Sequence, residues 1–486
     1  MKDRASQSPT TKRILKALSI FGGVQVMHIL CAVIRTKLAA IWIGPAGVGL
    51  MAIYHSTTEF MSNTTQLNLR QSAVRDLSLD KDKPVQAEKT TALVRRLALF
   101  LGIAGTVIFI AASPLLGWIQ FGDFDHTVPF IILSAIMLLS AVAQGELAIM
   151  QGRERLRRLA KATLYSSLTS SLLSLPLFYF FRIDSIVPVL LLFSVSSLFF
   201  ALLFSDRKLR SIWQKARHGR TRNFASHLRS DIRQGRGMLS LGLYMTISSS
   251  VTLLASYIFI AYLNRTGSNN IVGFYQSGYT LINSYIGLIF TSISMEFYPR
   301  LSATVMHTHR AEVIVAHEIR VILSILAPVI VAFICAKELI VNILYSSAFD
   351  AVIPYIAFAI LGTAFRAFSW PLAFVMPAKG DGRIYVVSET VSSAFYLILN
   401  IPLYNAYGFA GLGVAYIIWY GLYSVITFSI CRFRYGLHLN KGILLLLATV
   451  LAIGGIAFAL DRCYGPLSAS VMLIPSALLA FRAIRK

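Results

Sequence analysis

Long apolar runs follow one another along almost the whole chain and are separated by short polar segments. Most of them approach or exceed the roughly 20 residues that a helix needs to cross the hydrocarbon core of a bilayer. The pattern therefore predicts an all-α polytopic membrane protein with about 14 transmembrane helices. The predicted spans are residues 17–41, 48–69, 93–116, 127–149, 160–181, 185–204, 237–263, 271–297, 319–343, 351–376, 384–404, 408–430, 442–460 and 466–482.

The polar segments between these spans carry an asymmetric charge. The chain has 45 Lys and Arg against 21 Asp and Glu, a net charge of +24. When the spans alternate in direction, 38 of the 45 cations fall on one side, and only Arg182, Arg265 and Arg462 fall on the other. Lys and Arg accumulate on the cytoplasmic side, so both termini are predicted to be cytoplasmic. Topology explains the basicity, and no nucleic-acid partner is expected.

The composition agrees with a membrane protein. Charged residues make up 14% of the chain, where a soluble domain has about a quarter. The cysteines Cys31, Cys335, Cys431 and Cys463 stand singly, which predicts neither a disulfide nor a metal site. The apolar run over 17–41 is too long for a signal peptide, so no cleavable signal is expected.

Two parts of the chain resemble each other. Residues 44–50, which open the second span, are similar to residues 267–275, which open the eighth. An even number of spans separates the copies, so both have the same orientation, as in transporters built from parallel repeats. We expect two pseudo-symmetric six-helix lobes followed by two further helices. The predicted parts are a cytoplasmic N-terminus (1–16), an N-lobe (17–204), a basic cytoplasmic linker (205–236), a C-lobe (237–430), and two additional spans with a short tail (431–486).

The basic linker allows two interpretations. Its ten Lys and Arg residues suit anionic lipid headgroups. An orientation signal that also connects the lobes is the simpler interpretation, and membrane lipids are expected partners in either case.

Charges within spans are the candidates for function, because a charge in hydrocarbon is costly unless it faces protein or a watery cavity. Arg366 lies near the middle of the tenth span and Glu59 near the middle of the second, too deep to reach water by extending the side chain. Arg35 lies about 10 Å from the outer end of the first span at helical rise, and Lys37 is nearer the interface. For Arg366 and Glu59 a cavity-facing role is favoured over a structural ion pair. For Arg35 neither interpretation is favoured, and for Lys37 a structural role is favoured.

Two polar faces accompany these charges. Gln25, His28 and Arg35 share one face of the first span. In the second span, polar residues spaced 4, 3 and 4 apart also share one face. They are His55, Glu59, Ser62 and Gln66.

Four further charged residues lie near span ends. Glu389 is equally suited to binding a proton or sodium ion and to a helix-end role, whereas a structural role is favoured for Glu146. Lys337 and Glu338 are expected to form a pair near the outer face.

Enzyme signatures are absent from the sequence. There is no GxxxxGK[ST] phosphate loop and no acidic-pair motif in the first outer loop. No catalytic residue, metal site or cofactor is predicted, apart from a transported H⁺ or Na⁺. The outer loops are too short to hold the site of a polysaccharide polymerase or ligase, which is the alternative from a different class.

Four short stretches carry a family resemblance: 43–50 (IGPAGVGL), 151–160 (QGRERLRRLA), 297–302 (FYPRLS) and 407–416 (YGFAGLGVAY). In order and position they resemble the polysaccharide flippases of the multidrug/oligosaccharidyl-lipid/polysaccharide (MOP) superfamily, in particular Wzx-type O-antigen and enterobacterial common antigen translocases. The resemblance implies two six-helix lobes around a central cavity. It also implies transport of an undecaprenyl-diphosphate-linked oligosaccharide from the cytoplasmic to the periplasmic leaflet of a bacterial inner membrane.

Site roles follow from this resemblance together with depth and chemistry. Cavity cations in such flippases are expected to engage the lipid diphosphate, and a polysaccharide polymerase and a chain-length regulator are expected partners. An ion-coupled multidrug exporter of the same superfamily is the runner-up, although it should have a carboxylate-dominated cavity. The predicted substrate-binding residues are Arg366, Arg35, Lys37, His28 and Gln66, and the predicted ion-coupling residues are Glu59 and Glu389.

Overall fold

The structure of the chain is a computed structural model. It describes residues 9–80, 83–205, 236–287 and 307–485, with a few positions between 289 and 304; side chains are described from residue 31 onward, except at scattered positions. Most of the predicted linker and the side chain of His28 therefore lie outside the described residues. Within the described ranges the chain is helical, without strands, and about 14 helices are counted, which confirms the predicted fold class.

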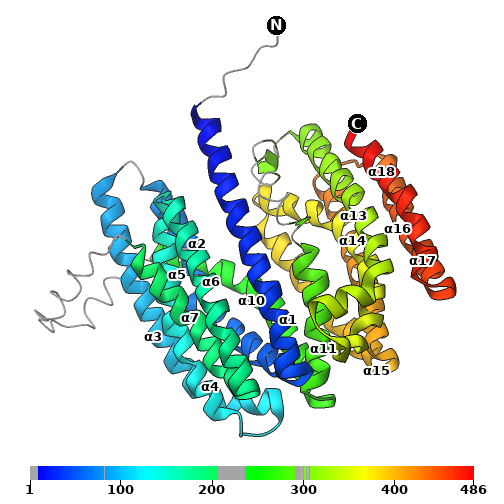
Figure 1. Cartoon of the computed structure of the whole chain (residues 1–486). Helices are drawn as coiled ribbons and strands as arrows, with labels where there is room; N and C mark the ends of the chain where they lie inside the picture. Colours follow the sequence, from blue (N-terminus) through cyan, green and yellow to red (C-terminus); the bar gives the residue numbers. More distant parts are fainter. Residues whose placement is uncertain are drawn as a thin grey trace, which may run out of the picture. The chain divides into compact units, whose positions relative to one another are not determined.

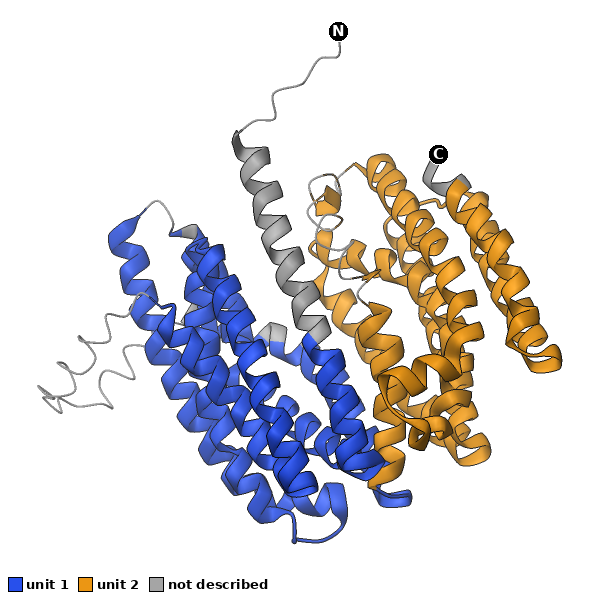
Figure 2. Ribbon diagram, viewed as in Figure 1, with its two compact units in different colours: residues 1–268 blue, residues 269–486 orange. Residues whose placement is uncertain are grey.

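The chain divides into two compact units, residues 1–268 and 269–486, coloured blue and orange in Figure 2. Helix α10, predicted to open the C-lobe, packs against α1, α2 and α3 and belongs to the first unit. The predicted lobe boundaries stay predictions.

Unit 1 is a bundle of long helices, in which α3, α5, α6 and α7 run alongside one another (Figure 1). Aromatic and aliphatic side chains such as Phe109, Phe130 and Phe178 form its core and are fully buried. Its elements are α1 (Pro9–Gln66), α2 (Leu69–Leu79), α3 (Pro84–Phe121), α4 (Thr127–Leu133), α5 (Ala135–Gly152), α6 (Leu156–Phe181), η1 (Arg182–Ser185), α7 (Ile186–Leu203) and α10 (Arg236–Thr266).

In unit 2, α13 packs against α14, α16 and α18, and α14 packs along α15. A π-helical turn, η2, follows α11 directly. The elements are α11 (Asn269–Tyr279), η2 (Thr280–Tyr285), α13 (Thr308–Leu344), η3 (Ser347–Val352), α14 (Ile353–Ala378), α15 (Gly382–Ser429), η4 (Ile430–Arg434), α16 (Lys441–Tyr464), α17 (Pro466–Ala469), η5 (Ser470–Met472) and α18 (Leu473–Arg485).

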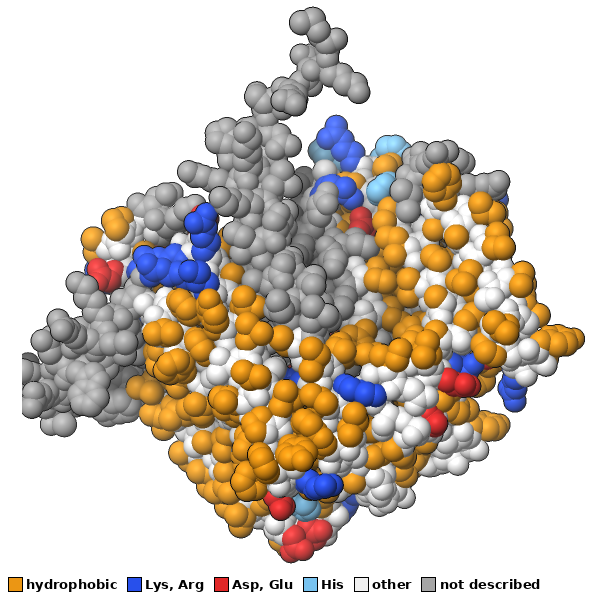
Figure 3. Space-filling view, viewed as in Figure 1, with side chains coloured by type: hydrophobic (Ala, Val, Ile, Leu, Met, Phe, Trp, Pro, Cys, Tyr) orange, Lys and Arg blue, Asp and Glu red, His pale blue; other side chains and the backbone are white. Residues whose placement is uncertain are grey.

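The surface of these helices is suited to lipid. Eight described stretches are long and apolar enough to cross a membrane, and some, such as Leu156–Leu203, contain two helices in succession. Large apolar side chains remain exposed on them, including Leu172, Phe180 and Leu445. Figure 3 shows hydrophobic side chains over the flank of unit 1, with charged side chains mainly toward its two ends. The chain is a multi-pass membrane protein.

Two glycines turn the chain back on itself within long helices. Gly44 in α1 (φ 63°) and Gly408 in α15 (φ 59°) both have left-handed backbones, which glycine adopts without a steric penalty. Each begins a similar run, GPAGVG at 44–49 and GFAGLG at 408–413. The predicted break between the spans 17–41 and 48–69 is confirmed. The similar run at 408–413 joins the two arms of α15 in the same way.

Replacing Gly411 with alanine is expected to destabilise the protein. A Cβ at this position would lie 1.9 Å from the carbonyl oxygen of Leu403, so the backbone itself would have to move. Overpacking of this kind costs about 1–3 kcal/mol. The thermal unfolding midpoint of purified protein in detergent measures the effect. Gly421→Ala on the same arm is the control, because nothing lies within 4 Å of its Cβ position. Equal midpoints for the two variants would contradict the prediction.

One predicted pair is wrong. Lys337 does not pair with its neighbour Glu338; its Nζ lies 2.7 Å from Oδ2 of Asp461 on α16, and both side chains of this pair are largely buried. Successive residues of a helix point in different directions, whereas Asp461 approaches Lys337 from a packed neighbour. The ion pair attaches α16 to α13.

Candidate functional site

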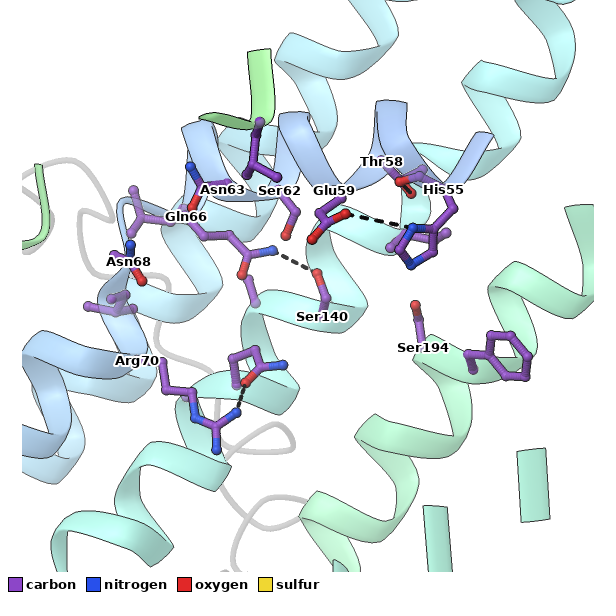
Figure 4. A pocket seen from close by; sticks show the side chains of 18 of the residues that line it. His55, Thr58, Glu59, Ser62, Asn63, Gln66, Asn68, Arg70, Ser140 and Ser194 are labelled. Carbon is purple, nitrogen blue, oxygen red and sulfur yellow. Dashed lines mark hydrogen bonds and ion pairs between the residues drawn. The ribbon is translucent and has the colours of Figure 1, made fainter. Parts of the chain in front are cut away.

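A polar cavity of about 420 Å³ lies in unit 1 (Figure 4). The second arm of α1 supplies one wall, and α2, α3, α5, α7 and α10 supply the others. The four residues predicted to share a face of the second span all line it. Its polar lining residues are His55, Thr58, Glu59, Ser62, Asn63, Gln66, Asn68, Arg70, Ser140, Gln144 and Ser194.

The charged end of the α1 wall is accessible. His55 Nδ1 lies 3.7 Å from Glu59 Oε2, one helical turn away, and both side chains are more than half exposed, at 61% and 54%. Glu59 therefore faces the cavity, as predicted, and its carboxylate is not locked in a buried ion pair. Its role in ion coupling stays a prediction.

Amides and hydroxyls form the rest of the wall. Gln66 donates to Ser140 Oγ at 2.7 Å, and Arg70 donates to the side-chain oxygen of Gln144 at 2.8 Å (Figure 4). Asn63 donates to Ser250 at 3.0 Å. Neutral amide and hydroxyl groups both donate and accept hydrogen bonds, which suits a ligand that is rich in hydroxyls.

Sequence reasoning missed the wall that α5 supplies. Ser140 and Gln144 are four residues apart and hence on one face of a mostly apolar helix. That spacing was visible in the sequence and marks the same kind of polar stripe as the one on α1.

Of the candidates in the first span, Arg35 lies beside this cavity. The Arg35 guanidinium carbon lies 4.7 Å from the ring centroid of Phe193, a residue that lines the cavity. Arg35 itself lines a second pocket between α1 and α6. Lys37 is partly buried and is not among the lining residues of either pocket.

Arg366 lies in unit 2, among aromatic rings and one side-chain amide. Its Nη1 donates to Asn283 Oδ1 at 2.9 Å and approaches the Tyr416 hydroxyl at 3.5 Å. The guanidinium lies 4.9 Å from the ring centroid of Phe290 and 5.8 Å from that of Tyr420. Within the described residues no carboxylate forms an ion pair with it. A guanidinium that lies over aromatic faces is stabilised by cation–π attraction. Its positive charge is then not balanced by a carboxylate within the described ranges.

The partner of Arg366 is placed by the π-helical turn η2. Asn283 lies within this turn, and its buried Nδ2 has no hydrogen-bond partner in the part of the chain that is described. Single π turns recur at functional sites because they shift side chains out of the α-helical register. No pattern in the sequence identified Asn283.

Glu389 is held by a hydrogen bond between the two arms of α15. The Tyr423 hydroxyl donates to its Oε1, and Trp419 donates to Ser392 Oγ at 2.9 Å nearby. Its carboxylate is partly buried beside an aromatic wall. This geometry leaves both predicted interpretations open, and the ion-coupling role stays a prediction.

Glu146 forms a buried ion pair. Arg95 of α3 donates to both carboxylate oxygens of Glu146, at 2.8 and 3.0 Å, and the hydroxyl of Ser205 donates to one of them at 2.6 Å. The Glu146 side chain is 1% exposed. The structural interpretation favoured for Glu146 agrees with this geometry.

Outside the spans, two titratable groups are tuned by their contacts. Hydrogen bonds from Arg434 and Tyr435 hold the pKa of Asp381 below its ordinary value. Burial lowers the pKa of His126, whose Nδ1 lies 2.7 Å from the Tyr54 hydroxyl. No group of three or more potential metal ligands occurs among the residues that the structure describes.

Comparison with solved structures identifies the fold. The chain matches a structure described as lipid II flippase MurJ in an inward closed conformation, with a TM-score of 0.64 and 14% identity over 96% of this chain and 97% of that chain. It matches an inward-facing multidrug resistance MATE family transporter of the MOP superfamily with a TM-score of 0.66 and 14% identity, over 87% and 96%. A MOP superfamily transporter from Pyrococcus furiosus matches with a TM-score of 0.53 and 16% identity, over 87% and 96%. The fold is that of MOP superfamily transporters.

Comparison of the sequence with protein families identifies the family of the chain. The family described as polysaccharide biosynthesis protein matches residues 38–354, most of the chain. This chain belongs to that family, as its resemblance predicted. No curated protein sequence matches it.

Proposed function

We propose that this protein translocates an undecaprenyl-diphosphate-linked oligosaccharide, such as an O-antigen repeat unit, across a bacterial inner membrane. The direction is from the cytoplasmic to the periplasmic leaflet, with both termini of the chain in the cytoplasm. The observation that carries the proposal is Arg366, a cation within a span whose described polar partners are an amide and a phenol. Because no carboxylate is paired with this arginine among the described residues, its positive charge can attract an anionic ligand.

The two halves of the substrate headgroup require different chemistry. A diphosphate suits arginine, because the planar guanidinium donates two parallel hydrogen bonds to phosphate oxygens. In this proposal the candidates for binding the diphosphate are Arg366 in unit 2 and Arg35, Lys37 and His28 in unit 1. The sugar hydroxyls bind the amide and hydroxyl wall of the unit 1 cavity, at Gln66 and its neighbours.

Coupling is proposed to use a carboxylate. Glu59 in the cavity and Glu389 beside Tyr423 are the two candidates for binding a proton or sodium ion during alternating access. No further cofactor is required by this scheme. A polysaccharide polymerase and a chain-length regulator would receive the product in the periplasmic leaflet.

Reconstitution tests the function directly. Purified protein in vesicles is expected to move a fluorescent undecaprenyl-diphosphate oligosaccharide between leaflets, measured as the fraction of label that becomes accessible to a membrane-impermeant quencher. Vesicles that contain heat-inactivated protein are the control.

An assay in the same vesicles distinguishes this function from drug export. Drug export is the second candidate because the fold is also similar to that of a MATE family transporter. Flipping of the glycolipid without ion-driven uptake of a cationic dye supports the proposal. Dye transport without glycolipid flipping contradicts it.

A further inference from the structure

A second pocket, of about 280 Å³, forms a groove between α1 and α6 in unit 1. Its wall on α6 is a stripe of leucines, Leu168, Leu172 and Leu175, spaced 4 and 3 apart on one helical face. Ile34 of α1 and Leu172 are 55% and 69% exposed, so the groove opens at the surface of the unit. These apolar side chains form a surface that suits a hydrocarbon chain.

The groove has one charge, Arg35, and this residue lies between the groove and the polar cavity. Its guanidinium carbon is 4.7 Å from the ring centroid of Phe193, and Phe193 lines the cavity. Arg35 precedes Gly44 by nine residues and His55 follows it by eleven. At about 1.5 Å per residue both lie roughly 13–17 Å from the turn, which places the cation and the start of the cavity at a similar depth.

A buried hydroxyl supplies a second, independent sign of a ligand. Ser171 lines the groove, is only 8% exposed, and its Oγ has no hydrogen-bond partner in the described part of the chain. A buried hydroxyl without a partner is costly, at about 1–3 kcal/mol. A phosphate oxygen bound near Arg35 would accept its hydrogen bond.

We infer that this groove binds the polyprenyl tail of the lipid-linked substrate, with Arg35 at its phosphate. The apolar groove would hold the tail, Arg35 the phosphate and the polar cavity the sugars. The three features lie in the same order as these parts of the lipid. The inference rests on the proposed function for the identity of the lipid. It adds a fixed path for the tail along α1 and α6, instead of a tail that stays in bulk lipid.

Photolabelling of the full-length protein tests this path. The probe is undecaprenyl diphosphate with a diazirine on its tail, in vesicles of phosphatidylethanolamine and phosphatidylglycerol. After irradiation, mass spectrometry compares label on the 168–175 segment with label on the exposed face of α16 around Leu445. Labelling is expected to concentrate on 168–175. Equal labelling of both segments would overturn the inference.

Matched variants test the groove itself. Leu172→Trp fills it, whereas Leu173→Trp, on the same helix and 47% exposed, does not line it. Arg35→Gln removes the cation, and Arg182→Gln on the next element is the control for charge. Leu172→Trp and Arg35→Gln are each expected to lower labelling of 168–175 about tenfold, the effect of losing one charge-assisted contact or the apolar site. Labelling that is unchanged in both variants, or lowered equally in the controls, would overturn the inference.

Competition identifies the lipid. Unlabelled undecaprenyl phosphate is expected to displace the probe, and an equal excess of dioleoyl phosphatidylglycerol is not. Equal displacement by both would mean that the groove holds ordinary membrane lipid, which overturns the inference. If residues 168–175 are labelled in protein that fails to flip glycolipid, the result supports the tail groove and contradicts only the proposed function. If the protein flips glycolipid without labelling of 168–175, the result contradicts the tail groove and supports the proposed function.

Discussion

Arg366→Ala is expected to abolish surface polysaccharide in cells that depend on this protein, while the protein still inserts into the membrane. The guanidinium donates to Asn283 and lies over the rings of Phe290 and Tyr420, without a carboxylate partner among the described residues. Alanine removes the positive charge and leaves the aromatic setting in place. Loss of two charge-assisted hydrogen bonds to a diphosphate, at about 1.5–3 kcal/mol each, corresponds to roughly a 100-fold or greater fall in transport.

Glycan output, measured against the amount of protein in the membrane fraction, checks this result. Arg366→Lys keeps the charge but loses the planar fork, so it should retain a small part of the activity. Arg462→Ala removes an exposed arginine of the same unit and should leave output unchanged. Normal glycan output from Arg366→Ala would refute the assignment of this residue to the substrate.

The second large effect is on stability. Glu146→Ala is expected to lower the free energy of unfolding by about 3–5 kcal/mol, because it leaves the Arg95 guanidinium and the Ser205 hydroxyl without their shared acceptor. The expected measurement is a lower unfolding midpoint of purified protein in detergent. Glu338→Ala, at an exposed position, is the control and should change stability by less than about 0.5 kcal/mol.

A double variant separates pairing from burial at this site. Arg95→Met combined with Glu146→Leu removes both charges and fills similar space, so it should recover much of the stability that Glu146→Ala loses. If the double variant is less stable than Glu146→Ala alone, the loss does not come from an unpaired buried charge.

The number and order of the helices could be predicted from the sequence because both follow from local properties. The lengths of the apolar runs predicted the spans, and a glycine–proline pair marked the turn at Gly44. The polar face of the second span was also predictable, because helical spacing alone places Glu59 and Gln66 on one side. These residues line a cavity in the structure.

Long-range partners could not be predicted in the same way. Arg366 is recognisable as a buried cation, but Asn283 is 83 residues away and reaches it from a π-helical turn that no local pattern marked. Lys337 was assigned to its sequence neighbour because only neighbours are visible without the fold. The groove beside Arg35 depends on how α6 packs against α1, which two separate apolar runs do not specify.

The Lys337–Asp461 pair has a consequence for the order in which the chain is assembled. The counter-charge of a lysine in α13 comes from α16, 124 residues later in the sequence. Before α16 enters the membrane, an ammonium group within a span costs up to about 2.5–3.5 kcal/mol. The ion pair of Lys337 can therefore form only after α16 has been synthesised, so the last turns of α13 reach their final packing late in assembly.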